Sequence, residues 1–472
     1  MKLPPSPAAA GLHAIASALR NGTTTCIDLT QATLARIAAL EPRLQAFLHL
    51  DAPRALRHAQ ALDGLFSAGV DLGPLMGIPV AAKDHFTVQG MPTAAGTRLD
   101  IQDLVAPQGP FIDALMRAGC IILGKTRATE FALGGFNFDQ PPPWNPCDPS
   151  QPRMTGGSSH GSAVAMAAGL AGFTLGSDTG GSVRWPAAMC GVVGYKASST
   201  QWPCDGVFPL SPELDSIGFF TQSAHDAAFV HAALTGESSR TLPGIQELTL
   251  ALPAQHFMDD VDEPVLRCFQ EAVARLRAAG ARIVTMDLPE AGEIDEVFRS
   301  LVPADLLAYL GRDRVRSQFE RIDAVAAERL QFAFDVQGDD YARMLARRRE
   351  VQRRVTQRCA GIDAWLSPTV PMLPAPTAHF KTVAEAAAWN RRATRNTRPG
   401  NLFGQCGISL PIQHLASNAG GQTPLAGLPV GLQLGAAPGQ DRTLLGLART
   451  IEDLLGRPQA PAMDALTTEP RQ

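Results

Sequence analysis

The amino-acid sequence predicts a single large α/β domain, with a mixed, mostly parallel central sheet surrounded by helices. The chain has 472 residues, of which 45% are hydrophobic and only 18% are charged, so it can bury a large core. From Asp113 onward the pattern runs helix, strand, helix, which is typical of parallel strands joined by crossover helices. Short apolar runs predict strands at residues 46–50, 119–123, 248–252, 281–284, 365–370 and 428–434.

Taken in order, the chain divides into three regions of this one domain, which spans residues 1–472. Residues 1–70 are predicted to form an N-terminal helical layer, and residues 71–220 the core with the glycine-rich motifs. Residues 293–395 have a mainly helical pattern and are expected on the substrate side. Individual helices are predicted at residues 8–20, 26–41, 53–68, 163–172, 265–279 and 441–455.

The composition excludes several classes of function. The formal net charge is −4 and the isoelectric point about 6.2, so no overall basic field attracts nucleic acid or an anionic membrane. The eight cysteines contain no C-x-x-C pair and are interpreted as buried thiols in a reducing compartment. No apolar run approaches eighteen residues, and the first residues lack the apolar stretch of a signal peptide. We therefore expect a cytoplasmic protein without nucleic-acid or membrane partners, for which a homodimer is one compatible assembly.

One local run of arginines contrasts with the net negative charge of the whole chain. A nucleic-acid surface is one interpretation of it, but a solvated helix face is favoured because the chain as a whole is acidic. The arginines of this run are Arg343, Arg347, Arg348, Arg349, Arg353 and Arg354.

The residues suited to chemistry concentrate between positions 154 and 187, where two Gly-Gly-Ser turns stand 24 residues apart. The first turn is 156–158 and the second 180–182. Paired glycines allow positive φ and a close approach of backbones. A serine behind them can be presented beside free backbone N–H groups, which is what the nucleophile of an acyl-transfer reaction needs.

Residues 119–126 match the literal phosphate-loop pattern G-x-x-x-x-G-K-T. A phosphate loop follows a strand and offers bare backbone amides, whereas residues 120–123 are themselves an apolar strand. Nucleotide binding at this segment is therefore disfavoured.

A second literal match is the nucleophile elbow G-x-S-x-G at residues 157–161, with Ser159 as the nucleophile. Such an elbow leaves a hydrophobic strand, but the preceding residues 149–153 are polar and proline-rich. Asp215 and His225 are available as its acid and base, yet nothing in their context distinguishes them. This interpretation is also disfavoured.

Lys83 supports a third interpretation, because it lies in an apolar strand context. The apolar residues are Ile78, Val80, Ala81 and Ala82 before it and Phe86 and Val88 after it. Desolvation disfavours an ammonium and lowers its pKa, which can leave a neutral amine able to accept a proton. A buried lysine paired with Asp84 or another carboxylate fits the same context. The residues alone leave both alternatives open.

Together these motifs resemble the amidase signature family of serine hydrolases. The likeness is closest over residues 156–187, where DTGGSVR at 178–184, followed by Pro186, is similar to the family's nucleophile segment. GIPVAAKD at 77–84 resembles its lysine strand. Further segments in family order lie at residues 124–126, 130–132, 145–146, 190–194 and 427–433, so the resemblance covers most of the chain.

The resemblance implies a Ser–Ser–Lys site. Ser182 would be the nucleophile and Lys83 the base, with Ser158 as the proton bridge between them and a cis Gly157–Ser158 peptide. Leu133 and Gly134 would line the acyl pocket. Neither a metal nor another cofactor is implied. The oxyanion hole would consist of the backbone N–H groups of Thr179, Gly180, Gly181 and Ser182.

The resemblance also bears on two further pairs of residues. Asp178 and Arg184 are interpreted as an ion pair that braces the nucleophile loop. His85 stands where the family usually has Asn, and His160 where it has Gly or Ser. The favoured interpretation places both rings on loop surfaces, with His160 in solvent. The alternative is that they tune Lys83 or contact the substrate.

The function expected from the sequence is hydrolysis of a small-molecule carboxylic amide to an acid plus ammonia or an amine. One alternative is a glutaminase similar to the glutaminase component of glutamyl-tRNA amidotransferase, which would act with partner chains. Residues 396–402 (NTRPGNL) lack the acidic residue expected there for a glutamine ammonium, so this alternative ranks lower. Hydrolysis of carbamates or esters by the same site is another alternative, and a binding protein with a dead site is the last.

Overall fold

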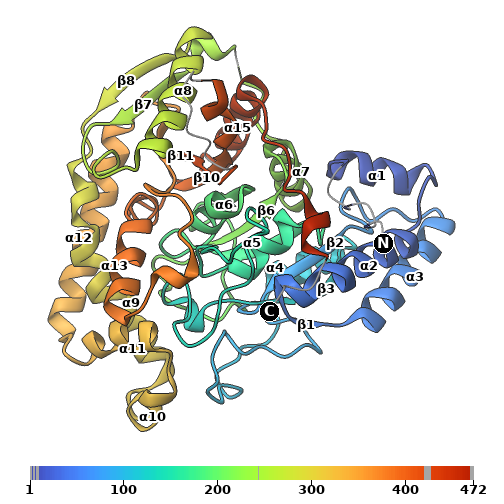
Figure 1. The fold of residues 1–472 in the computed structure, drawn as a ribbon, viewed down its shortest axis with the longest axis horizontal. Helices are drawn as coiled ribbons and strands as arrows, with labels where there is room; N and C mark the ends of the chain where they lie inside the picture. The colour runs from blue at the N-terminus through green and yellow to red at the C-terminus, as the bar shows by residue number, and fades with distance from the viewer. Residues whose placement is uncertain (1–2, 4–5, 7–9, 243, 419–426, 468–472) are drawn as a thin grey trace.

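The computed structural model is organised around one large mixed sheet, whose described part has eleven strands (Figure 1). The structure describes residues 3, 6, 10–242, 244–418 and 427–467. The order across the sheet is β1-β3-β2-β4-β6-β5-β10-β11-β9-β7-β8. The strands are β1 Phe47–Leu50, β2 Pro79–Lys83, β3 Ile121–Thr126, β4 Phe173–Ser177, β5 Val193–Lys196, β6 Ile217–Thr221, β7 Thr249–Pro253, β8 Arg282–Met286, β9 Ala364–Pro368, β10 Cys406–Pro411 and β11 Gly431–Ala436.

The α/β class and the mixed sheet are confirmed, but the balance of strand pairings differs from the expectation. Among the described residues, four pairings are parallel and six are antiparallel. The sheet is therefore not mostly parallel. The link between β5 and β6, residues 197–216, contains no helix. Parallel neighbours need a crossover, usually a helix, so this short return makes an antiparallel pair.

Helices cover the sheet and extend from it at both ends (Figure 1). Their bounds within the described residues are α1 Leu12–Arg20, α2 Cys26–Leu44, α3 Ala52–Ser67, α4 Pro110–Arg117, α5 His160–Ala167, α6 Arg184–Cys190, α7 Ala224–Thr235, α8 Glu263–Ala278, α9 Ile294–Leu310, α10 Arg312–Gln318, α11 Ala324–Leu330, α12 Gly338–Arg358, α13 Val383–Ala393, α14 Arg398–Leu402 and α15 Asp441–Leu455.

Helices α1–α3 form the N-terminal layer, with β1 on the adjacent edge of the sheet (Figure 1). The helix α2 begins after Thr25, whose hydroxyl accepts a hydrogen bond from the backbone N–H of Asp28. It runs through Pro42 to Leu44, slightly beyond the predicted end. Residues 8 and 9 of the first predicted helix lie outside the described residues.

Two short helices, α5 and α6, occupy the centre of the molecule (Figure 1). Every residue of both is buried. In α5 the small residues Gly, Ser and Ala let the helix pack closely against its neighbours. The helix α5 ends at Ala167, earlier than predicted, because the chain turns at Gly169 with φ of +65°. Both Gly-Gly-Ser turns lead directly into these helices.

The region 293–395 is mainly helical, as predicted, and lies beside the core as α9 to α13 (Figure 1). The strand β9 interrupts it and pairs with β7 and β11 in the main sheet. A separate buried cluster forms around α9, with Val297, Leu301 and Leu306 among its members. The helical region is therefore fixed to the core through the sheet.

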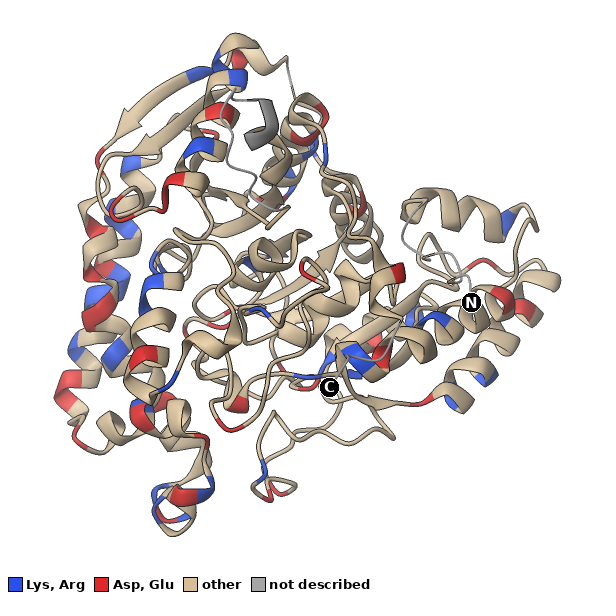
Figure 2. Ribbon diagram, viewed as in Figure 1, with Lys and Arg blue, Asp and Glu red and all other residues tan. Residues whose placement is uncertain are grey.

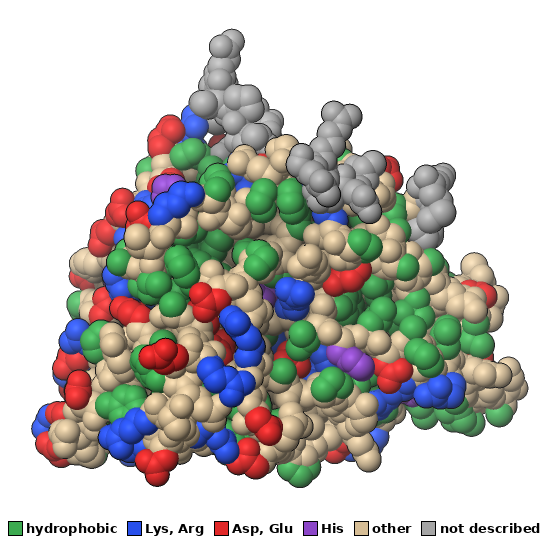
Figure 3. All heavy atoms as spheres, turned by 60° about the horizontal axis from the view of Figure 1, so that its bottom comes forward, with side chains coloured by type: hydrophobic (Ala, Val, Ile, Leu, Met, Phe, Trp, Pro, Cys, Tyr) green, Lys and Arg blue, Asp and Glu red, His purple; other side chains and the backbone are tan. Residues whose placement is uncertain are grey.

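The charged residues concentrate on the outer helices, while the centre of the ribbon is mostly uncharged (Figure 2). Acidic and basic side chains also alternate over the face of the helical region seen in Figure 3. This mixture supports the solvated-face interpretation of the arginine run on α12. Its ion pairs are Arg343 with Asp339 and Asp340, Arg347 with Glu293 and Glu350, Arg348 with Glu213, and Arg354 with Glu350. Among the described helices, none is both long and apolar enough to cross a bilayer.

Candidate active site

The two Gly-Gly-Ser turns meet inside the protein. Ser158 lies two residues before α5, and Ser182 lies in the loop between β4 and α6. The backbone N–H of Ser159 donates to the carbonyl oxygen of Ser182 at 3.3 Å, which holds the two turns side by side. The chain runs from the first turn through α5 and β4 and comes back to the second turn, which brings serines 24 residues apart close together.

Close approach explains why glycines precede both serines. Gly181 has φ of +120°, and a Cβ there would lie 2.0 Å from Thr397 Oγ1. A Cβ on Gly157 would lie 2.2 Å from the carbonyl oxygen of Gly135. The Gly157–Ser158 peptide is cis, in agreement with the expectation from the resemblance.

Lys83 ends β2 with its side chain fully buried. Its Nζ donates to Ser158 Oγ at 2.7 Å and to Ser177 Oγ at 2.8 Å. Burial lowers the pKa of Lys83 from 10.5 to about 7, although the charge of Asp215 raises it in part. A large fraction of Lys83 is therefore the neutral amine at neutral pH.

Asp84, the carboxylate considered as an alternative partner of Lys83, is paired with a different lysine. Asp84 Oδ1 lies 3.3 Å from Lys125 Nζ, and both side chains are fully buried. Lys125 also donates to the carbonyl oxygens of Asp84 and Pro92 and to Thr93 Oγ1. Lys83 is in no ion pair among the described residues, so the pairing of Lys83 with Asp84 is wrong.

Ser182 is presented to a cavity, and its hydroxyl has no hydrogen-bond partner in the described part of the chain. The neighbouring N–H of Gly181 donates to Asp178 Oδ1 at 2.8 Å. This N–H is therefore already engaged, which differs from the expectation for Gly181 in an oxyanion hole. For Thr179, Gly180 and Ser182, no acceptor for the backbone N–H lies among the described residues.

The ion pair that braces the loop is present. Arg184 Nη2 lies 2.9 Å from Asp178 Oδ1, and both side chains are buried. Burial alone would raise the pKa of Asp178, but the Arg184 charge holds it well below its usual range. Arg184 also donates to Gln433 Oε1 on β11 at 2.9 Å and to Asn401 Oδ1 on α14 at 2.7 Å.

Sequence reasoning missed two residues beside Lys83. Ser177, the last residue of β4, accepts the second hydrogen bond of the amine. Asp215 accepts hydrogen bonds from Thr179 Oγ1 and from the N–H groups of Leu210 and Ser211. Burial raises the pKa of Asp215 to about 6. Ser177 directly precedes the nucleophile segment and Asp215 was considered only for the elbow pattern, so the fold is what reveals that both lie near Lys83.

Neither competing pattern finds the geometry it needs. Most of the phosphate-loop pattern is not a loop, because residues 121–126 form the buried strand β3. Its lysine, Lys125, donates a hydrogen bond to the carboxylate of Asp84. In the elbow pattern, Ser159 is fully buried and no strand precedes it. His225 lies near the surface and binds Asp453 instead of a serine.

The expectation that His85 and His160 lie on loop surfaces is wrong. His85 is 0% exposed and His160 4% exposed, because both pack around the buried Lys83. Neither ring nitrogen of His85 has a partner among the described residues, nor has Nδ1 of His160. Burial, followed by the charge of Lys83, lowers the pKa of His160 to about 3 and that of His85 well below 6.5. Both rings are therefore neutral at neutral pH.

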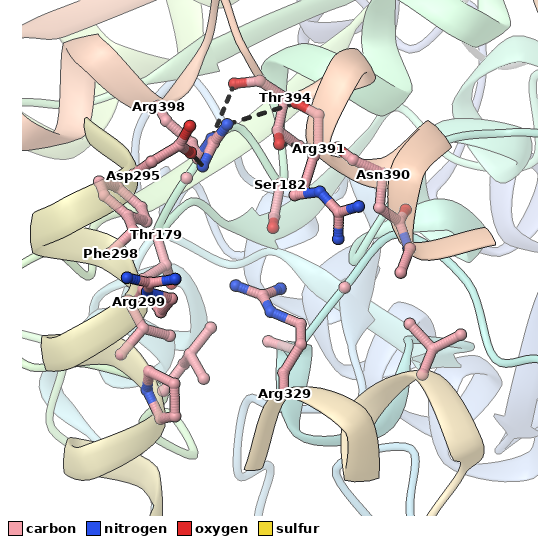
Figure 4. Close-up of a pocket in the computed structure, with 18 of the residues that line it drawn as sticks. Thr179, Ser182, Asp295, Phe298, Arg299, Arg329, Asn390, Arg391, Thr394 and Arg398 are labelled. Atoms are coloured by element: carbon pink, nitrogen blue, oxygen red, sulfur yellow. Dashed lines mark hydrogen bonds and ion pairs between the residues drawn. The ribbon is translucent and has the colours of Figure 1, made fainter. Parts of the chain in front are cut away.

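Ser182 opens into a cavity of about 410 Å³ between the core and the helical region. Figure 4 shows Ser182 and Thr179 on the core side and side chains of α9, α11 and α13 around them. Gly134 lines this cavity, but Leu133 does not, since its side chain is buried in the core. Leu133 is therefore outside the lining of this cavity, and its role in the acyl pocket stays a prediction. No cluster of three or more His, Cys, Asp or Glu side chains suited to a metal is found in the described residues.

The comparisons with known proteins define the class of this protein as a hydrolase that acts on amide carbon–nitrogen bonds. The chain belongs to the amidase family, whose profile, described as Amidase, matches residues 28–445. It is 37% identical to 2-amino-5-chloromuconic acid deaminase from Comamonas testosteroni, over 94% of this chain and 96% of that protein. It is 32% identical to mandelamide hydrolase from Pseudomonas putida, over 96% and 93%.

A solved structure described as a crystal structure of amidase is similar in fold, with a TM-score of 0.81 and 32% sequence identity. The match covers 94% of this chain and 100% of that chain. Other relatives at 32% identity are A subunits of glutamyl-tRNA(Gln) amidotransferase, for example from Chloroflexus aurantiacus, over 93% of this chain and 95% of that protein.

The burial of His160 generates a prediction for His160→Gly. The pH dependence of turnover should keep its acid limb, because a ring with a pKa of about 3 does not titrate near pH 6.5. The free energy of unfolding should fall by about 1–3 kcal/mol above pH 6.5, since a buried ring is lost and glycine weakens a helix start.

The pH dependence of this stability difference has a defined sign. The unfolded state binds a proton on His160 near pH 6.5, whereas the folded state binds it only near pH 3. Each pH unit between these values removes about 1.4 kcal/mol from the wild type alone, so the difference between wild type and His160→Gly should vanish and then change sign as the pH falls from 6.5 towards 3. Urea unfolding across this range and rate measurements on one amide check both parts. Loss of the acid limb in the variant would contradict the prediction.

Proposed function

We propose that this protein hydrolyses a small carboxylic amide through an acyl-enzyme on Ser182, with Ser158 and Lys83 as the proton relay. The observation that carries the proposal is the 2.7 Å contact between Lys83 Nζ and Ser158 Oγ at a fully buried site beside Ser182. A buried amine with a pKa of about 7 is a competent base at neutral pH. The Ser182 hydroxyl faces the cavity, where a carbonyl carbon can reach it.

In the first step the neutral amine of Lys83 takes the proton of Ser158 Oγ, and Ser158 Oγ takes the proton of Ser182 Oγ. The Ser182 oxygen forms a bond to the carbonyl carbon, and the carbonyl electron pair moves onto its oxygen. The free N–H groups of Thr179, Gly180 and Ser182 are suited to stabilise that oxyanion. Gly181 is left out because Asp178 holds its N–H.

The relay then runs in reverse. The carbon–nitrogen bond breaks as the leaving nitrogen takes a proton from Ser158, which recovers it from Lys83. Water attacks the acyl-enzyme with the same two proton transfers and releases the acid, leaving Ser182 and the neutral Lys83 restored. Ser177, the second acceptor of Lys83, keeps the amine in position during both passes.

A glutaminase that acts with partner chains remains the second candidate, since A subunits of glutamyl-tRNA(Gln) amidotransferase are 32% identical to this chain. In the segment 396–402, the side chains of Asn396 and Asn401 are hydrogen-bonded within the protein. Asn396 binds the carbonyl oxygens of Phe257 and Pro368, and Asn401 binds Arg184 and Asp178. It offers no carboxylate for an ammonium, which favours the amidase proposal. Ester and carbamate hydrolysis would use the same relay.

The expected cytoplasmic location and homodimer remain predictions. Light scattering of the purified protein would determine the assembly, and cell fractionation the location. The relatives' names include one acid and one uncharged amide, so the charge of this protein's substrate has to be inferred from its own cavity.

The role of Ser182 is tested by Ser182→Ala, with Ser159→Ala as the control. Ser182→Ala should lower amide turnover by about 10³-fold or more and abolish labelling by a fluorophosphonate probe, with an unchanged unfolding midpoint. Ser159→Ala should still be labelled. Labelling that persists in the first variant and disappears in the second would move the nucleophile to Ser159.

The role of Lys83 as base is tested by Lys83→Arg beside Lys83→Ala. Both should lower kcat by about 10²–10⁴-fold, because a guanidinium stays protonated and cannot accept the Ser158 proton. In wild type the rate should rise as the pH increases through about 7, where the amine becomes neutral. Substantial activity in Lys83→Arg would refute the assignment.

Asp215 offers a test of the electrostatics around the base. Its charge raises the pKa of Lys83, so Asp215→Asn should move the acid limb of the rate profile to lower pH. An asparagine can keep the local contacts, with its oxygen accepting from Leu210 and Ser211 and its amide donating to Thr179. The ratio of the rate at pH 6 to that at pH 8 should increase. If the acid limb of Asp215→Asn does not shift and its rate falls equally at both pH values, the role of Asp215 is purely structural.

A further inference from the structure

The cavity in front of Ser182 contains more positive charge than hydrolysis of a neutral amide requires. Four arginines line it: Arg299 from α9, Arg329 from α11, Arg391 from α13 and Arg398 from α14. Figure 4 shows the guanidinium groups of Arg329 and Arg391 extending into the space in front of Ser182. Arg329 is half-buried, while Arg299 and Arg391 are exposed at the mouth.

Arg398 differs from the other three because its charge is neutralised. Its Nη1 donates to Asp295 Oδ1 at 2.6 Å, and Nη2 donates to the carbonyl oxygen of Arg391 at 3.3 Å (Figure 4). For Arg299, Arg329 and Arg391, no salt bridge to a carboxylate occurs among the described residues. Guanidinium groups that converge without a carboxylate form an anion site.

The acidic side chains that line the cavity are one fewer than its arginines, so they cancel only part of this charge. Three of them line it: Asp295, Glu296 and Glu328. Asp295 is committed to Arg398. Glu328 precedes Arg329 on α11, and adjacent helical residues point in different directions, although its charge does raise the pKa of Arg329. Burial, with the charges of Arg398 and Arg391, still lowers that pKa to about 10, so Arg329 stays a cation at neutral pH.

Two buried polar groups at the same cavity also lack partners. Asn390 is 7% exposed, and neither its Oδ1 nor its Nδ2 has a hydrogen-bond partner within the described chain. The indole Nε1 of Trp185 is likewise buried and unpaired. Both residues line the cavity, and Figure 4 shows Asn390 beside Arg391. An unpaired buried donor is costly, so these groups are suited to bind a polar ligand.

We infer that the substrate is a small amide that carries a carboxylate, held by Arg329 and Arg391 while its amide carbonyl lies at Ser182. This inference rests on the proposed function, because it assigns the second end of the same substrate. The cavity volume of about 410 Å³ fits a molecule of small-metabolite size. Phe298, Val302 and Val325 give the space between its two polar ends an apolar wall.

The test compares substrates of equal shape and different charge. Glutaramate and glutaramide differ only in that a carboxylate replaces the second amide, as do succinamate and succinamide or adipamate and adipamide. In wild type we expect kcat/KM to be at least about 10-fold higher for the best carboxylate than for its diamide, mainly through KM. The preference should weaken as the salt concentration rises.

Arg329→Gln and Arg391→Gln test the arginines named in the inference. The ratio of kcat/KM for glutaramate to that for glutaramide should fall about 10-fold in each variant. Arg391 is exposed, so its substitution leaves the fold intact even where Arg329→Gln does not. Arg349→Gln is the matched control, an exposed arginine of α12 outside the cavity, and should keep the wild-type ratio.

A binding measurement separates this inference from the proposed function. Glutarate, the product of glutaramate hydrolysis, should raise the melting temperature of wild type and of Arg349→Gln but not of Arg329→Gln. Glutaramide should not raise that of Ser182→Ala, which cannot hydrolyse it to a carboxylate, whereas glutarate should. Equal kcat/KM for both members of every pair, with no stabilisation by glutarate, would overturn the inference while leaving the hydrolase proposal intact. Stabilisation by glutarate in a protein whose Ser182 neither labels nor turns over any amide would overturn the hydrolase proposal alone.

Discussion

The burial of Lys83 without a carboxylate is the constraint on which the rest of the site depends. An ammonium at the end of β2 loses its hydration and gains only two hydroxyl acceptors, Ser158 and Ser177, so the neutral amine is favoured. The nearby carboxylate of Asp84 would reverse this balance if it paired with Lys83. Lys125, on the neighbouring strand β3, prevents this by pairing with Asp84. The second buried lysine thus keeps the carboxylate from stabilising the ammonium form of the first.

The nucleophile loop is shaped by a second buried ion pair. Asp178 accepts the N–H groups of Gly181 and Val183 as well as the Arg184 guanidinium. These contacts fold the loop back on itself, while the N–H groups of Thr179, Gly180 and Ser182 have no acceptor among the described residues. The same contacts explain why one of the four candidate oxyanion donors is unavailable. A carboxylate that shapes such a loop necessarily uses some of the amides that the loop presents.

The sequence alone was sufficient to identify the site residues that lie within motifs. The paired turns, the lysine strand and the Asp178–Arg184 pair could be identified because each stands in a distinctive local context. Ser177 and Asp215 could not, since a serine at a strand end and an aspartate in a loop are ordinary until the fold brings them to Lys83. Burial of His85 and His160 was missed for a similar reason. Their environment is set by α5 and β2 packing face to face, which no local pattern reveals. The antiparallel strands β10 and β11 depend on pairings between distant segments in the same way.

The bonds that Arg184 makes to Gln433 and Asn401 also bear on the order in which the protein is assembled during translation. A nascent chain released up to residue 190 already contains Lys83, both serine turns and α6, but neither β10 nor β11. Of the strands in the sheet, only β1 to β4 exist at that point, and the Arg184 guanidinium has Asp178 but neither Gln433 nor Asn401 as a partner. Contacts this distant in sequence form late, because the intervening chain must be ordered first. The loop that presents Ser182 therefore reaches its final shape only when nearly the whole polypeptide has left the ribosome.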